Sequence, residues 1–220
     1  MKTKSLILTA LLTVAGTAGL MAQSSNVYSQ NIVGYISQSY KQGYQLTACH
    51  FKGSPNNQIS TMIPTAPDGT FVYKFKKGIG GYTVDSFVDG AWEGDDASML
   101  LSPGDGFWVY APSAFTNTFV GEIQLGSTNT IGNGYTILSS VIPQAGKLQT
   151  DLKFTPKEGD FIFQLKPTGG YKVNDLADGA WEGDDGGNEP TISVGESFWV
   201  YSNPASGAHT NWSRDFIVGP

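Results

Sequence analysis

The segment 89–96 reads Asp-Gly-Ala-Trp-Glu-Gly-Asp-Asp, and the segment 178–185 repeats it letter for letter. In each copy a Gly-Gly-Tyr sequence comes before the octapeptide and a Phe-Trp-Val-Tyr sequence comes after it. Self-similarity at a fixed period is the sequence signature of a chain built from equivalent structural units. The repeated octapeptide therefore predicts two copies of one small fold.

Other segments recur at an offset of about 90 residues, with small shifts that loop insertions explain. The matching pairs are 33–36 with 120–123, 43–46 with 134–137, 68–73 with 158–163, 80–84 with 169–173, and 103–110 with 194–201. A partial third copy at 215–219 resembles 118–121. We therefore expect one module over 23–116 and a second over 117–220 with a closing strand at 215–219. Either each module uses this strand at both its ends, or the last copy caps the array.

The repeated segments have the composition of β-strands. They are short, rich in aromatic and β-branched residues, and separated by clusters of Gly, Pro, Asn and Asp. The chain contains 28 Gly and 11 Pro, which disfavour long helices, so at most a single helical turn is expected, near 60–63 or 148–152. We predict an all-β protein made of two tandem antiparallel modules, each a small sandwich or a partly open barrel.

The Phe-Trp-Val-Tyr strand at 107–110 has bulky residues on both faces. Side chains alternate along a strand, so Phe107 and Val109 share one face while Trp108 and Tyr110 share the other. Such a strand is either buried on both sides or meets a neighbouring module. Trp108 and its counterpart Trp199 are expected in the core.

Residues 1–22 have the features of a secretory signal peptide. Lys2 and Lys4 precede an apolar stretch rich in Leu, Ala and Thr, and Ala22 is a plausible cleavage position. A retained membrane anchor is the alternative, although the apolar stretch is short for a span of about 20 residues. We expect a secreted, extracellular or envelope-associated protein with no membrane span in the mature chain.

The net charge bears on which classes of partner the protein can bind. The formal net charge is −6, and it becomes more negative without the two lysines of the signal segment. An acidic surface repels nucleic acid and anionic lipid, so neither is expected as a partner.

Cys49 is the single cysteine, so no intramolecular disulfide can form. A buried thiol is expected there, with an intermolecular disulfide or a reactive thiol as alternatives.

The acidic loops are candidate calcium sites, because calcium prefers carboxylate and carbonyl oxygens on flexible, glycine-rich loops. The candidate ligands are Asp89, Glu93, Asp95 and Asp96 in the first copy, and Asp178, Glu182, Asp184 and Asp185 in the second. Neither loop contains a Lys or Arg to neutralise them. The spacing differs from that of an EF-hand. The alternative is a solvated turn, for which Asp and Gly are the usual residues.

Trp92 and Trp181 stand inside the acidic loops. An indole flanked by carboxylates resembles a sugar-binding site, where the ring stacks on the sugar and the acids accept its hydroxyls. The alternative is an indole that folds back and plugs one end of its module.

The sequence offers little support for catalysis. His50 and His209 are the only histidines, and neither has a counterpart in the other copy. The chain lacks a Gly-x-Ser-x-Gly elbow, a His-Glu-x-x-His zinc motif and a phosphate-binding loop. We therefore expect a protein that is not an enzyme.

Several motifs resemble those of exported bacterial repeat proteins found in planctomycete and verrucomicrobial lineages. The motifs are Gln-Asn-Ile-Val-Gly-Tyr-Ile at 30–36, Pro-Gly-Asp-Gly-Phe-Trp-Val-Tyr at 103–110, and Phe-Val-Gly-Glu-Ile at 119–123. The Gly-x-Gly-Phe-Trp-Val part is also similar to β-modules of microbial cell-surface proteins. The resemblance implies a secreted or envelope-associated module and carries no catalytic residues.

These observations support two functional hypotheses. The first is a non-catalytic structural or interaction protein of rigid modules that binds itself or other envelope or matrix proteins. The second is a carbohydrate-binding module that uses the Trp-containing loops, with calcium as a candidate cofactor.

Overall fold

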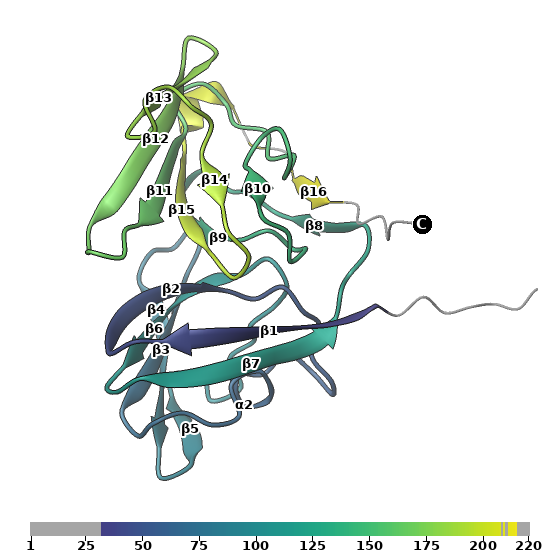
Figure 1. Cartoon of the computed structure of the whole chain (residues 1–220), viewed down its shortest axis with the longest axis vertical. Helices are drawn as coiled ribbons and strands as arrows, with labels where there is room; N and C mark the ends of the chain where they lie inside the picture. The colour runs from purple at the N-terminus through teal and green to yellow at the C-terminus, as the bar shows by residue number, and fades with distance from the viewer. Residues whose placement is uncertain (1–31, 208, 210, 215–220) are drawn as a thin grey trace, which may run out of the picture. The chain divides into compact units, whose positions relative to one another are not determined.

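The computed structural model describes residues 32–207, 209 and 211–214 of the chain (Figure 1). The strands are β1 (Val33–Tyr40), β2 (Gly43–Ala48), β3 (Thr70–Phe75), β4 (Tyr82–Val88), β5 (Ala91–Gly94), β6 (Gly106–Ala111), β7 (Phe115–Glu122), β8 (Ser127–Asn129), β9 (Gly134–Leu138), β10 (Gly146–Lys147), β11 (Phe161–Leu165), β12 (Tyr171–Ala177), β13 (Ala180–Gly183), β14 (Thr191–Ile192), β15 (Phe198–Ser202) and β16 (Trp212–Arg214). Two short helical turns are α2 (Ile59–Met62), as expected near residue 60, and η1 (Pro204–Ser206).

The fold is all-β, as predicted, and its strand pairs are antiparallel. Within the described residues none of the sheets closes into a barrel, and no helix has the length and apolar character of a membrane span. The expected signal peptide at 1–22 and the expected closing strand at 215–219 lie outside the described residues.

Each copy of the repeat forms a five-stranded sheet with the same strand order. The first sheet has the order β2-β6-β3-β4-β5, and the second has the order β9-β15-β11-β12-β13. The Phe-Trp-Val-Tyr strand has the same position in both sheets. Trp108 on β6 lies between Leu46 and Tyr73, and Trp199 on β15 has equivalent neighbours on β9 and β11.

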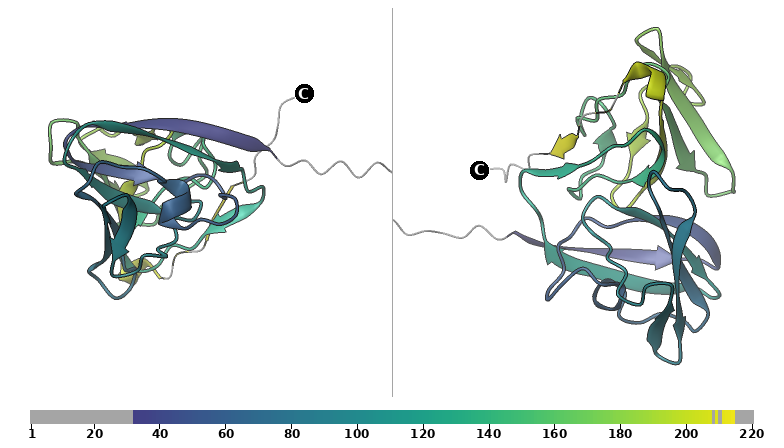
Figure 2. Two further views of the ribbon diagram at one scale, coloured as in Figure 1. Left: turned by 90° about the horizontal axis from the view of Figure 1, so that it is seen from below. Right: turned by 180° about the vertical axis from the view of Figure 1, so that it is seen from behind.

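The first sheet is covered on one face by a two-stranded ribbon of β1 and β7 (Figures 1 and 2). Tyr40 of β1 and Phe119 of β7 are buried in the same cluster as Phe107 and Val109 of β6. The predicted division between modules, at 116/117, falls inside β7. From Ile32 onwards the chain forms one compact unit, so the division into two modules stays a prediction.

Two hydrophobic clusters form the interior, one beneath each five-stranded sheet. The largest fully buried side chains of the first include Tyr40, Phe51, Phe107 and Met99. Those of the second include Phe154, Phe198 and Trp212. The indole of Trp212, which has no counterpart in the first copy, donates to the carbonyl of Leu152 at 2.7 Å. This tryptophan therefore fills the second cluster.

Polar contacts join the two copies side by side. The N–H of Ala48 donates to the carbonyl of Gly195 at 3.1 Å. The His50 ring bridges the same junction: its Nδ1 lies 2.6 Å from the carbonyl of Ser140, and its Nε2 accepts from the N–H of Gly195 at 3.1 Å. These contacts require a neutral ring with the proton on Nδ1. His50 therefore has a structural place between the copies.

Candidate functional site

The repeated octapeptide forms a β-hairpin in both copies. Asp89 and Gly90 have φ of 50° and 82°, and Asp178 and Gly179 have φ of 50° and 74°. An Asp-Gly pair with both φ values positive is the preferred connection between two twisted strands. The octapeptide identity therefore has a structural explanation in the turns from β4 to β5 and from β12 to β13.

Trp92 and Trp181 are buried, with 7% and 8% of their surface exposed. The Trp92 indole donates to the carbonyl of Ile63 at 2.7 Å and lies against Phe87, with ring centroids 5.3 Å apart. The Trp181 indole donates to Oε1 of Gln149 at 3.1 Å. Both indoles belong to the buried hydrophobic clusters, and neither presents a ring face at the surface.

Some of the loop carboxylates accept hydrogen bonds from backbone N–H groups. Asp95 accepts from the N–H of Val84 at 3.1 Å, and Asp184 accepts from Val173 at 2.9 Å. The described residues contain no group of three or more His, Cys, Asp or Glu side chains arranged to hold a metal ion. Asp89, Glu93, Asp178 and Glu182 are exposed at the hairpins.

A cation from outside the loop neutralises one of these acids. Lys172, 13 positions before Asp185 in the sequence, forms an ion pair with it at 3.0 Å. The hairpin of β12 and β13 brings the two side chains together, which the search for a cation within the loop itself could not detect.

The first hairpin lacks the ion pair that Lys172 forms in the second. Asn174 in the second copy donates its amide to Asp185 at 2.9 Å, but its counterpart in the first copy is Asp85. Asp85 is fully buried, accepts from the N–H of Asp96 at 3.0 Å, and has no partner for Oδ2. Burial raises the pKa of Asp85, and the carboxylates of Asp96 and Asp95 act in the same direction.

The expectation that Trp108 and Trp199 lie in the core is wrong, because both are half-buried and lie on the face opposite the cores. The core face of β6 carries Phe107 and Val109, both fully buried. The indoles share the other face with the aromatic residues of neighbouring strands. In the first sheet these are Tyr44, Phe71, Tyr73, Phe75, Tyr82 and Tyr110, and in the second Tyr135, Phe161, Phe163, Tyr171 and Tyr201.

This aromatic surface contains two clefts, which together we call the aromatic groove. The first cleft, of about 500 Å³, is lined by Tyr44, Tyr73, Tyr82, Trp108, Leu165 and Tyr171. The second, of about 400 Å³, is lined by Phe75, Tyr135, Phe163, Tyr171 and Trp199. Each cleft takes most of its lining from one sheet. The second sheet adds Leu165 and Tyr171 to the first cleft, and the first sheet adds Phe75 to the second cleft. Leu165 is the counterpart of Phe75, so the two clefts are built alike.

The ring geometry repeats closely between the sheets. Tyr44 and Trp108 have centroids 6.3 Å apart at an interplanar angle of 87°, and Tyr135 and Trp199 are 6.2 Å apart at 83°. Phe75 of the first sheet contacts Trp199 of the second, with ring centroids 4.8 Å apart and an interplanar angle of 73°. Edge-to-face pairs of this kind hold the rings in defined orientations.

Three phenols of the groove, those of Tyr73, Tyr82 and Tyr171, have raised pKa values. Burial, together with the hydrogen bond to Tyr44, raises the pKa of Tyr73 to about 12. Burial also raises the pKa of Tyr82, although its hydrogen bond with the Trp108 indole acts in the opposite direction. The same two effects act on Tyr171, whose hydrogen bond is with the Trp199 indole. These three phenols therefore stay neutral at ordinary pH.

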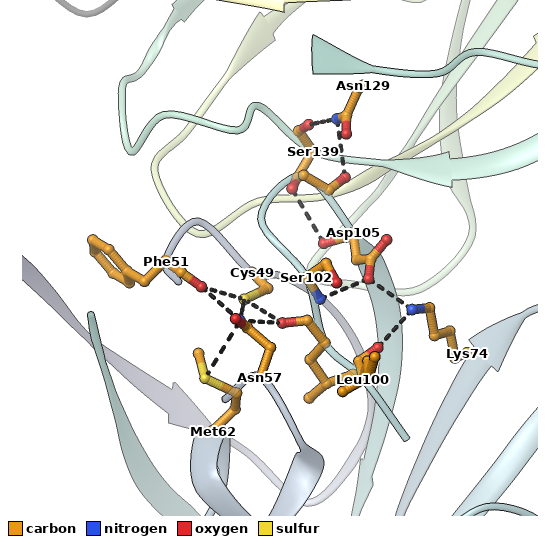
Figure 3. Close-up of polar contacts among 12 residues, drawn as sticks. Cys49, Phe51, Asn57, Met62, Lys74, Leu100, Ser102, Asp105, Asn129 and Ser139 are labelled. Atoms are coloured by element: carbon orange, nitrogen blue, oxygen red, sulfur yellow. Dashed lines mark hydrogen bonds and ion pairs between the residues drawn. The ribbon is translucent and has the colours of Figure 1, made fainter. Parts of the chain in front are cut away.

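A polar network under the first sheet fixes the start of the tryptophan strand β6 (Figure 3). Asp105 Oδ2 accepts from Nζ of Lys74 and from the N–H of Ser102, both at 2.7 Å. The second sheet has the same arrangement with different residues, because Gln164 donates to Glu196 at 2.8 Å. In both copies a polar side chain of the central strand thus holds the turn that leads to the groove tryptophan.

Cys49 lies beside this network, fully buried, and its thiol donates to the carbonyl of Leu101 at 3.0 Å (Figure 3). Burial raises the pKa of the Cys49 thiol to about 12. A neutral, enclosed thiol is a poor nucleophile. Of the roles considered for Cys49, these contacts fit the buried thiol.

No family model, curated protein or solved structure matches this chain. The candidate site therefore rests on the geometry of the groove. The alternation of Phe-Trp-Val-Tyr identified the two faces of its tryptophan strands, but the sequence did not reveal which face would be left open.

Proposed function

We propose that this chain is a non-catalytic interaction protein, secreted or associated with the cell envelope, that binds its partner through the aromatic groove. One observation carries the proposal. Both five-stranded sheets leave the aromatic face uncovered and cover the opposite face with hydrophobic clusters. Contiguous exposed apolar surface on a folded protein marks an interaction site.

The repetition of the groove adds support. Tyr44 and Tyr135 are equivalent residues on edge strands, and they remain 58% and 53% exposed. A tyrosine that served only the fold could be replaced by a shorter polar residue at such a position without opening a cavity. The same aromatic residue at both positions, beside the same tryptophan, is better explained by a partner that contacts both sheets.

The partner can be a second copy of the chain, another envelope or matrix protein, or a carbohydrate, and one set of variants tests the groove against all three. The groove variant combines Trp108→Ala with Trp199→Ala. The control variant is Tyr35→Ala, which truncates a residue that is 75% exposed on β1 and lines neither cleft. Sedimentation velocity measures self-association, and glycan and peptide arrays measure binding to other partners.

We expect at least one interaction that the groove variant loses and the control variant keeps. Truncating a central aromatic anchor of an interface costs about 2 kcal/mol or more, a loss of thirtyfold or greater. The proposal is contradicted if every interaction of the wild type survives at full strength in the groove variant.

A further inference from the structure

The chemistry of the two clefts restricts what can occupy them. None of the residues that line either cleft is charged, since all are Tyr, Trp, Phe or Leu. An anionic ligand group that enters such a cleft loses its hydration and gains no counter-charge, which is unfavourable. The lining therefore favours an uncharged group over an anion.

The surroundings of the clefts disfavour an anionic partner and a second copy of the chain. The same faces carry Glu93 at the edge of the first sheet, and Asp175 and Glu182 at the edge of the second. The chain as a whole has a net charge of −6. Two copies brought together through these faces would place like charges near one another, at a cost in binding free energy.

The arrangement of the clefts indicates a ligand with a repeating structure. Tyr171 lines both clefts, so they are immediate neighbours. They also present the same residue types, since Tyr44 and Trp108 in one correspond to Tyr135 and Trp199 in the other. A chain of like units can fill two like clefts at once, and each contact then raises the effective concentration for the other.

The polar edges of the lining select between uncharged chains. Tyrosine hydroxyls both donate and accept hydrogen bonds. A sugar ring matches this set, with an apolar face for stacking and hydroxyls around its rim. A proline-rich peptide offers rings of similar size, but its prolines lack N–H donors and supply acceptors alone.

We propose that the aromatic groove binds a neutral polysaccharide, with sugar rings stacked on the Trp108 and Trp199 sides of the two clefts. This inference rests on the proposed function, because it names the partner of the same groove. It moves the carbohydrate site from the buried indoles of the acidic loops to the half-buried indoles of β6 and β15.

Isothermal titration calorimetry with defined oligosaccharides tests the inference. The neutral probes are hexamers and trimers of cellulose, xylan and β-1,3-glucan. A galacturonate hexamer is the anionic probe and decaproline is the peptide probe. We expect one neutral hexamer to bind more tightly than its trimer. Trp108→Ala and Trp199→Ala should each lower the hexamer affinity by about tenfold, as expected for loss of one stacking anchor.

Matched variants separate loss of binding from loss of fold. Tyr44→Ala and Tyr135→Ala remove exposed rings at the cleft edges, so they weaken binding while the melting temperature stays close to that of the wild type. Tyr35→Ala should leave both binding and melting unchanged. Tryptophan emission should change on hexamer binding in the wild type, and the change should disappear in the Trp108→Ala, Trp199→Ala double variant.

The remaining outcomes distinguish the inference from the function on which it rests. Groove-dependent binding of decaproline, of the galacturonate hexamer or of a second copy, with no neutral oligosaccharide bound, overturns the polysaccharide inference and leaves the interaction function standing. If the groove variants weaken no binding in the full panel, both the polysaccharide inference and the interaction function are overturned.

Discussion

Asp85→Asn should stabilise the protein, because it gives the first hairpin the hydrogen bond that the second already has. Asp85 is fully buried and its Oδ2 has no partner. At the equivalent position Asn174 donates to Asp185 at 2.9 Å and accepts from the N–H of Asp185 at 2.9 Å. An asparagine at position 85 can keep the acceptor for the N–H of Asp96 and add a donor toward its carboxylate.

The magnitude follows from the unpartnered oxygen. A buried polar group without a partner costs about 1–3 kcal/mol, so we expect a gain of about that size at pH 7. For a chain of this length, 1 kcal/mol corresponds to about 2–4 °C in melting temperature.

The gain should depend on pH. The pKa of Asp85 in the folded state is raised above its ordinary value of 3.8, so the folded state holds this proton more tightly than the unfolded state. The wild type therefore loses stability as pH rises above about 4 toward the raised pKa. The asparagine variant does not have this loss, so its advantage should grow from pH 4 to pH 7.

Thermal and urea unfolding of both proteins between pH 4 and pH 7 measure the difference. The reciprocal change, Asn174→Asp, is the matched control. It should destabilise the second hairpin at pH 7, by less than the full amount because Lys172 lies beside Asp185. An Asp85→Asn variant that is less stable than the wild type at pH 7, or whose gain is the same at both ends of the range, refutes this account of the hairpin.

Three further predictions concern the interior. Burial lowers the pKa of His50 to about 4. Up to roughly 3 kcal/mol of the free energy of unfolding, present above pH 6.5, should therefore be lost as the pH falls from 6.5 through 4. His50→Gln should remove this step from the pH profile of urea unfolding, and an unchanged profile contradicts the prediction. Cys49 should resist a thiol reagent in the native protein and react on unfolding, whereas rapid native labelling would show that it is accessible. Trp92→Ala should cost about 3–5 kcal/mol, and clearly more than Trp108→Ala, by chemical denaturation; equal costs would mean that Trp92 is no more buried than Trp108.

The sequence alone determined the strand content and the positions of the tight turns. Gly and Asp at the repeated hairpins are local requirements of the backbone, because positive φ values restrict which residues fit. Alternation along Phe107–Tyr110 likewise determined which residues share a face, since it follows from strand geometry. These features depend on neighbours in the chain, so a single sequence contains them.

Only the tertiary structure decided which face of each sheet would be covered. Both faces of the tryptophan strands are bulky and apolar, so composition could not separate the core side from the open side. The β1–β7 ribbon covers the side of Phe107, and Trp108 remains on the groove. Trp92, which stands among carboxylates in the sequence, is buried because the hairpin places it beside Phe87. Burial is a property of segments distant in the sequence that come together, and this is why the groove could not be located before the fold.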